Sequence, residues 1–91
     1  MRSISDLVYH VETTDVDFID IDSDEAVKLS SYLLRNLKDY HELPGKIWEQ
    51  FCGICYWHRD NDFITEKQHY WLIVHLKEYI DQRQFTLQEM M

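Results

Sequence analysis

The chain has 91 residues, 45% of them hydrophobic and 14% aromatic, which suits one domain over residues 1–91 with a single modest core. Its formal net charge is −8 at pH 7. Eight of the seventeen carboxylates, but only one of the nine Lys and Arg residues, lie within residues 1–25, so this segment carries seven of the eight net negative charges. Such a face repels nucleic acid and attracts basic proteins, which excludes direct nucleic-acid binding as the function.

The apolar runs of this chain are short. The longest span only a few residues, far fewer than the roughly twenty that cross a bilayer. The N-terminus also lacks the basic and apolar regions of a signal peptide. We therefore expect a soluble, cytoplasmic chain without a membrane partner.

The first quarter of the chain is rich in β-branched and aromatic residues. These residues form two stretches, 4–12 and 15–22, with two threonines between them. This composition predicts a β-hairpin over about 4–22. The alternation of apolar and acidic residues changes phase between Phe18 and Ile19, which predicts a bulge there.

Three helices are expected after the hairpin. Apolar residues at steps of three and four predict helices over about 24–40, 46–57 and 65–83, and the polar residues 58–62 predict a loop. The expected fold class is therefore α+β, with an N-terminal β-hairpin followed by three α-helices.

Two of these helices carry sequence signals for their start. Asp22 or Ser23 is placed to cap the first helix, and the acids at 24 and 25 favour the positive end of its dipole. Thr65 and Gln68 have the spacing of a capping box at the start of the last helix.

The acidic residues of the expected hairpin could form a row of phosphate-like charges. Alternate side chains of a strand share one face at roughly 6.6–6.8 Å, close to the phosphate spacing along one DNA strand. The partner-binding residues expected on this ground are Glu12, Asp15, Asp17, Asp20, Asp22, Asp24 and Glu25. The alternatives are a solvated face that only keeps the protein soluble, or a single divalent-ion site.

An EF-hand loop does not account for these acids. Asp20, Asp22 and Asp24 have its initial spacing, but Glu25 stands where the loop requires glycine, and Ser31 stands in place of the final glutamate.

Cys52 and Cys55 have the spacing of a metal or redox motif. A zinc site requires four ligands, and no other histidines or cysteines are paired at the usual spacing. A redox pair of the thioredoxin type would open a helix, whereas this pair lies inside a helical pattern. We expect reduced, buried, metal-free cysteines, with Gly53 between them allowing a close helix approach.

The sequence shows no catalytic constellation. Two glycines cannot form a phosphate-cradling loop, and the serines follow no nucleophile pattern. We expect a protein that is not an enzyme and has no cofactor and no metal.

The expected acidic hairpin from Glu12 to Glu25, joined to a small helical body, resembles the phage-encoded DNA mimics. In length, acidity and strand-then-helix order the chain is most similar to the Arn family of T-even phage anti-restriction proteins. This resemblance implies an early phage product in the cytoplasm of a bacterial host. There it would occupy the DNA site of a restriction nuclease or nucleoid-associated protein, with the seven acidic residues as phosphate surrogates.

A helical interaction module, such as an antitoxin or a regulatory subunit, is the alternative function. Such a module would bind through an aromatic face, for which Trp48, Trp57 and Trp71 are candidate anchors unless they lie in the core. The heavy aromatic content also predicts a homodimer, because pairing would cover apolar surface.

Overall fold

The protein is all-helical in the part described by its structure, a computed structural model that covers residues 2–36 and 45–83. No β-strand occurs in those two ranges, so the expected α+β class and the β-hairpin over 4–22 are wrong. The elements are α1 (Ile4–Thr13), the 3-10 turn η1 (Val16–Phe18), α2 (Ser23–Asn36), α3 (Gly45–Asn61) and α4 (Glu66–Arg83).

The first expected strand is helix α1. Ile4, Leu7, Val8 and Val11 recur at the steps of three and four that place side chains on one helical face, and the last three are buried. Ser3 caps the helix by accepting a hydrogen bond from a first-turn backbone N–H at 3.2 Å. Burial of this face against other helices outweighs the weak strand preference of its β-branched residues.

The second expected strand is an irregular connector with one 3-10 turn. Ile21 is buried, Val16 and Ile19 are partly buried against the core, and Phe18 is 74% exposed. The change of phase near Phe18 therefore marks the turn η1. It is not a bulge, because the connector pairs with no strand.

Helix α2 begins with a reciprocal capping box. Asp22 Oδ1 accepts from the Glu25 N–H at 2.7 Å, and Glu25 Oε1 accepts from the Asp22 N–H at 3.1 Å. Asp22 is thus the cap, one of the two residues expected. Leu29 and Leu33 are buried on the expected face, and the expected end of the helix near residue 40 lies outside the described residues.

Helix α3 continues beyond its expected end at residue 57. Residues 58–61 are helical instead of forming a loop, and the helix ends where Asp62 takes a left-handed backbone with φ of 63°. The Asp62 N–H donates to the His58 carbonyl at 2.7 Å, which satisfies one of the last carbonyls of the helix. A short polar run was therefore not sufficient to end this helix.

Helix α4 begins and ends close to the expected residues. The Thr65 N–H donates to Gln68 Oε1 at 2.8 Å, and the Gln68 N–H donates to Thr65 Oγ1 at 3.1 Å, which confirms the predicted capping box.

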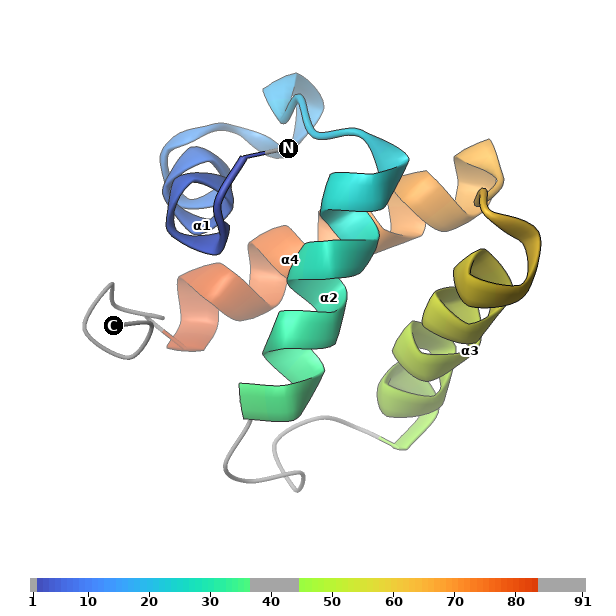
Figure 1. Cartoon of the computed structure of the whole chain (residues 1–91). Coiled ribbons are helices and arrows are strands. Elements are labelled where there is room, and N and C mark those ends of the chain that lie inside the picture. Colours follow the sequence, from blue (N-terminus) through green and yellow to red (C-terminus); the bar gives the residue numbers. More distant parts are fainter. Residues whose placement is uncertain (1, 37–44, 84–91) are drawn as a thin grey trace.

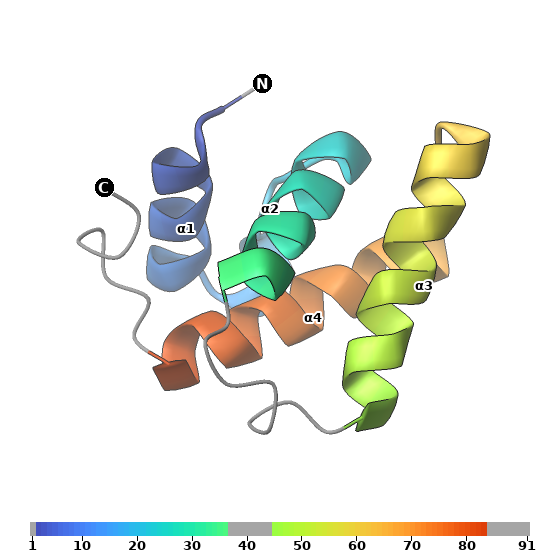
Figure 2. The same ribbon diagram turned by 60° about the horizontal axis from the view of Figure 1, so that its bottom comes forward.

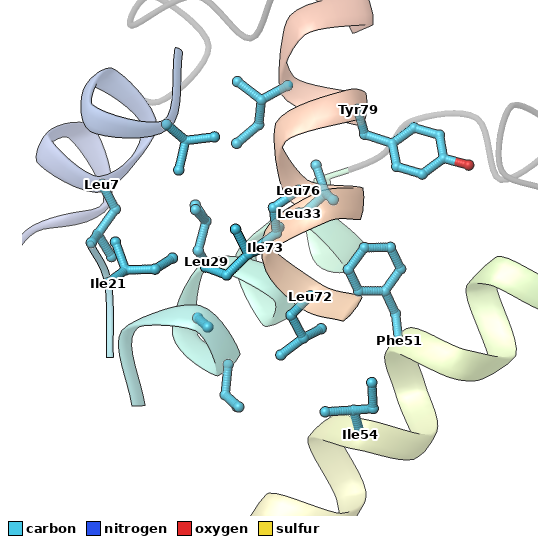
Figure 3. Packing of buried hydrophobic residues seen from close by; sticks show 14 of the residues in the cluster. Leu7, Ile21, Leu29, Leu33, Phe51, Ile54, Leu72, Ile73, Leu76 and Tyr79 are labelled. Atoms are coloured by element: carbon cyan, nitrogen blue, oxygen red, sulfur yellow. The ribbon is translucent and has the colours of Figure 1, made fainter. Parts of the chain in front are cut away.

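The four helices enclose one core. Helix α2 lies between α1 and α3 in both views, and α4, which contacts α1 and α2, passes behind α2 in Figure 1 and runs below α1 and α2 in Figure 2. Leu7 of α1, Leu29 of α2, Phe51 of α3 and Leu72 of α4 are all buried and converge in the centre (Figure 3). The rings of Phe51 and Trp71 meet edge to face at 4.9 Å and join α3 to α4.

Candidate functional site

The connector between α1 and α2 carries most of the exposed acidic residues in this part of the chain. It runs over one edge of the molecule from the end of α1 through η1 to the start of α2 (Figure 1). We call this surface the acidic edge. Its carboxylates, all on exposed residues, are Glu12, Asp15, Asp17, Asp20, Asp22 and Asp24.

Side chains from two helices hold the backbone of the acidic edge in place. His10 Nε2 of α1 accepts from the Asp20 N–H at 2.8 Å, and His69 Nε2 of α4 donates to the Ile21 carbonyl at 2.8 Å. Lys77 of α4 donates to two carbonyls in the last turn of α1, at 2.9 and 3.1 Å. These contacts fix the path of the chain without using the carboxylates.

Three of the six carboxylates on the acidic edge do not help to hold the fold together. The carboxylates of Glu12, Asp15 and Asp17 make no hydrogen bond or ion pair within residues 2–36 and 45–83. Asp20 adds its carboxylate beside Arg2, whose guanidinium donates to the Asp20 carbonyl. The pKa of Arg2 is raised, chiefly by its hydrogen bond to Glu25 and further by the charges of Glu25, Asp20 and Asp22, while burial acts in the opposite direction.

Asp22 and Asp24 are exposed but also serve the fold. Asp22 caps α2, as described above. Asp24 accepts a hydrogen bond from His58 Nε2 at 2.7 Å, which ties the start of α2 to the end of α3. A partner would have to compete with His58 for the Asp24 carboxylate.

Glu25 is not on the acidic edge. It is 6% exposed and accepts from Arg2 Nε at 2.9 Å and Nη2 at 3.0 Å. These bonds, together with the Asp22 and Arg2 backbone N–H groups, lower the pKa of Glu25 to about 2 against the effect of burial. The structure thus brings together six of the seven expected residues and turns the seventh inward.

The structure contradicts the argument that the spacing of these carboxylates resembles that of DNA phosphates. It required an extended strand with alternate side chains on one face, whereas residues 15–22 form a 3-10 turn with flanking irregular chain. The concentration of charge remains, without a DNA-like register.

Sequence reasoning missed the basic residues that support this edge: Arg2, His10, His69 and Lys77. One signal was present for the inward turn of Glu25. Glu25 stands three residues after the cap Asp22, the capping-box position, which turns its carboxylate back toward the chain and away from solvent.

A second exposed surface lies where α3 meets α4. Trp57 is 42% exposed and Phe63 is 52% exposed, and their rings meet edge to face at 6.1 Å. Tyr56 is also exposed, with the Arg59 guanidinium 4.9 Å from its ring centre. We call Tyr56, Trp57 and Phe63 the aromatic corner. The other two candidate anchors, Trp48 and Trp71, are partly buried against the core.

The cysteine pair differs from its expected environment. Cys52 and Cys55 are both free and only half-buried, so the expectation that they are buried is wrong. Gly53 does not allow a close helix approach either, because a Cβ built there would meet nothing within 4 Å. The packing around position 53 therefore does not require a glycine there.

The described residues contain no group of three or more His, Cys, Asp or Glu side chains arranged to hold a metal ion. Within the same residues, no helix is both long and apolar enough to cross a membrane.

Comparison of the chain with protein-family models, curated proteins and solved structures found no match. Arguments about function therefore rest on the surfaces described above.

Proposed function

We propose that this protein is an acidic inhibitor that occupies the basic nucleic-acid-binding site of another protein. The observation that supports the proposal is the acidic edge, six exposed carboxylates on a backbone held by His10, His69 and Lys77. The class of target, a restriction nuclease or nucleoid-associated protein in the cytoplasm of a bacterial host, comes from the resemblance to phage DNA mimics, which now rests on length and acidity because the strand-then-helix order is wrong.

The proposed mechanism is binding, without catalysis or a cofactor. Because the backbone of the acidic edge is already held in place, its carboxylates lose less conformational entropy than those of a flexible chain when they meet Lys and Arg side chains, and they compete directly with phosphates for them. The carboxylates of Glu12, Asp15 and Asp17 are best placed for this role, because they give up no internal partner on binding. The structure limits the mimicry to charge, since the chain has no DNA-like spacing.

Removal of charge from the acidic edge tests this proposal. In the triple variant Asp15→Asn, Asp17→Asn and Asp20→Asn, side-chain size stays nearly constant while three negative charges are lost. At about 0.5–1 kcal/mol for each exposed pair, binding to a basic partner captured from bacterial lysate should weaken by roughly 10- to 100-fold at low salt. The wild type should also compete with duplex DNA for that partner, and its affinity should fall steeply with salt.

A matched control removes the same charge elsewhere. Glu49→Gln, Asp60→Asn and Asp62→Asn change three exposed acids on α3 and the loop after it, and asparagine tolerates the left-handed backbone at 62. This control should bind as the wild type does. Circular dichroism should show that both triple variants are folded. If they then bind the partner equally well, the acidic edge has no role in binding and only keeps the protein soluble.

The aromatic corner favours a second candidate function, a helical interaction module of the antitoxin or regulatory-subunit type. Its Trp57 and Phe63 rings are exposed and already packed together, as in the anchors of protein interfaces. Binding through this corner should depend little on salt and be lost in the Trp57→Ala, Phe63→Ala variant. A partner that is held in high salt and released by this variant would favour the module over the inhibitor.

A further inference from the structure

Helix α4 carries an apolar patch on the side that faces away from α1 and α2 (Figure 2). Tyr70 is 63% exposed in this patch, and Trp71 and Val74 are half-buried beside it. These three side chains and Lys67 line a groove of about 390 Å³. We call the surface formed by Lys67, Tyr70, Trp71, Val74 and Glu78 the outer face of α4.

The outer face is a consequence of helical spacing. Its residues recur at steps of three and four, which places them on one side of the helix. The opposite side of α4 carries Leu72, Ile73 and Leu76, which are buried in the core. A partner that covers the outer face would remove the exposed Tyr70 ring from water, which is a favourable change.

The charges of the outer face lie at opposite ends of its apolar patch. Lys67 is exposed in the first turn of α4, and Glu78 is exposed in the C-terminal half of the helix. Within one chain these two residues are eleven positions apart, roughly 16 Å along the helix, so they cannot pair directly with each other. A cation in the first turn of a helix is also disfavoured by the dipole of that helix.

A second copy of α4 in antiparallel orientation matches this charge pattern. Positions 67 and 78 are equally distant from the point midway between positions 72 and 73. A two-fold axis at this point therefore places Lys67 of each copy opposite Glu78 of the other, roughly 8 Å from the axis. The same axis places Trp71 of each copy opposite Val74 of the other, which joins the two apolar patches. A parallel pair would instead place like charges opposite each other.

We propose that the outer face of α4 binds the outer face of a second copy of this chain, with the two helices antiparallel in a symmetric dimer. Trp71 and Val74 form the apolar centre of this interface, and two symmetry-related Lys67–Glu78 pairs set its orientation. The interface uses none of the carboxylates of the acidic edge, so it is independent of the proposed inhibitor function.

Sedimentation equilibrium of the full chain at physiological salt tests the proposal. The screening length there is about 8 Å, which limits the repulsion between two copies that each carry a net charge of −8. The wild type should be a dimer at micromolar concentration, and Val74→Asp should be a monomer because it places a charge in the apolar centre. Lys67→Glu and Glu78→Lys should each weaken the dimer by about 5- to 30-fold, since each reversal puts like charges opposite each other at two positions.

A mixture of the two charge variants provides the sharpest measurement. In a heterodimer of Lys67→Glu with Glu78→Lys, opposite charges face each other at both positions again. An equal mixture should therefore dimerise more tightly than either variant alone, with an affinity close to that of the wild type. The mixture changes only exposed residues, so it gives an answer even if Val74→Asp unfolds.

Matched controls carry the same changes of charge elsewhere. Arg35→Glu on α2 and Asp17→Lys in η1 alter exposed residues outside the outer face and should dimerise as the wild type does. Circular dichroism should show that every variant is folded. A wild type that stays monomeric, a mixture no tighter than either single variant, or an equal loss of affinity in the controls would overturn the proposal.

Discussion

The Arg2–Glu25 ion pair leads us to predict how the stability of the protein depends on the charge of Glu25 and on pH. Removing the charge of Glu25 with Glu25→Gln should destabilise the protein at neutral pH. The carboxylate has a pKa of about 2 in the fold against an ordinary value of 4.5, mainly because Arg2 donates hydrogen bonds to it. A difference of this size corresponds to about 3 kcal/mol, and screening at the half-exposed Arg2 side chain reduces it to about 2 kcal/mol.

The sign of the pH dependence follows from the lowered pKa. This contribution to stability is fully present above pH 4.5, where the unfolded chain is also ionised, and is lost as the pH falls through 2. The wild type should therefore lose stability between pH 4.5 and 2, and the difference from Glu25→Gln should shrink over the same interval. At pH 7, a loss of about 2 kcal/mol lowers the melting temperature by roughly 10 °C for a chain of this size.

Thermal and urea unfolding, followed by circular dichroism at pH 7 and pH 3, provide the measurement. Glu12→Gln is the control, because Glu12 is exposed and its carboxylate makes no hydrogen bond or ion pair in the described part of the chain. It should change stability little at either pH. If Glu25→Gln unfolds at the same temperature as the wild type at pH 7, or if its deficit is equally large at pH 3, the reasoning about the Arg2 pair is wrong.

Further predictions concern packing, helix structure and assembly. Gly53→Ala should raise the free energy of unfolding by about 0.5–1 kcal/mol, because position 53 is an exposed helix interior where an added Cβ meets nothing. Leu72→Ala should lower it by about 2–5 kcal/mol in urea unfolding, since Leu72 is fully buried in the centre of the core. Thr65→Ala should cost about 1 kcal/mol by removing one half of the α4 capping box, and a change below 0.3 kcal/mol would show the cap to be redundant. Sedimentation velocity should show a homodimer at micromolar concentration, and a monomer throughout would contradict that expectation.

The sequence predicted the later helices better than the first one for a physical reason. Helices α2 and α4 carry capping residues, Asp22 and Thr65, as well as regular apolar spacing, so two independent signals agree. In α1 the two signals conflict, because its β-branched residues favour a strand while its spacing favours a helix. The spacing was the stronger guide, since it decides which side chains are buried together.

The acidic edge was predictable only as a concentration of charge. Its carboxylates are local in sequence, whereas their support comes from residues such as His69 and Lys77, more than forty positions away. No local pattern predicts such contacts, because they depend on how α4 crosses α1. For the same reason, the burial of Glu25 by Arg2 required the tertiary structure.

The contact between Lys77 and the end of α1 has a consequence for how the chain assembles. Lys77 Nζ lies 2.9 Å from the Val11 carbonyl, across a separation of 66 residues. The α1 packing surface formed by Leu7, Val8 and Val11 cannot be fully covered until α4 has been synthesised. Closing so long a loop is entropically costly, so α1 should complete its docking late in folding and be the first element to detach under mild denaturation.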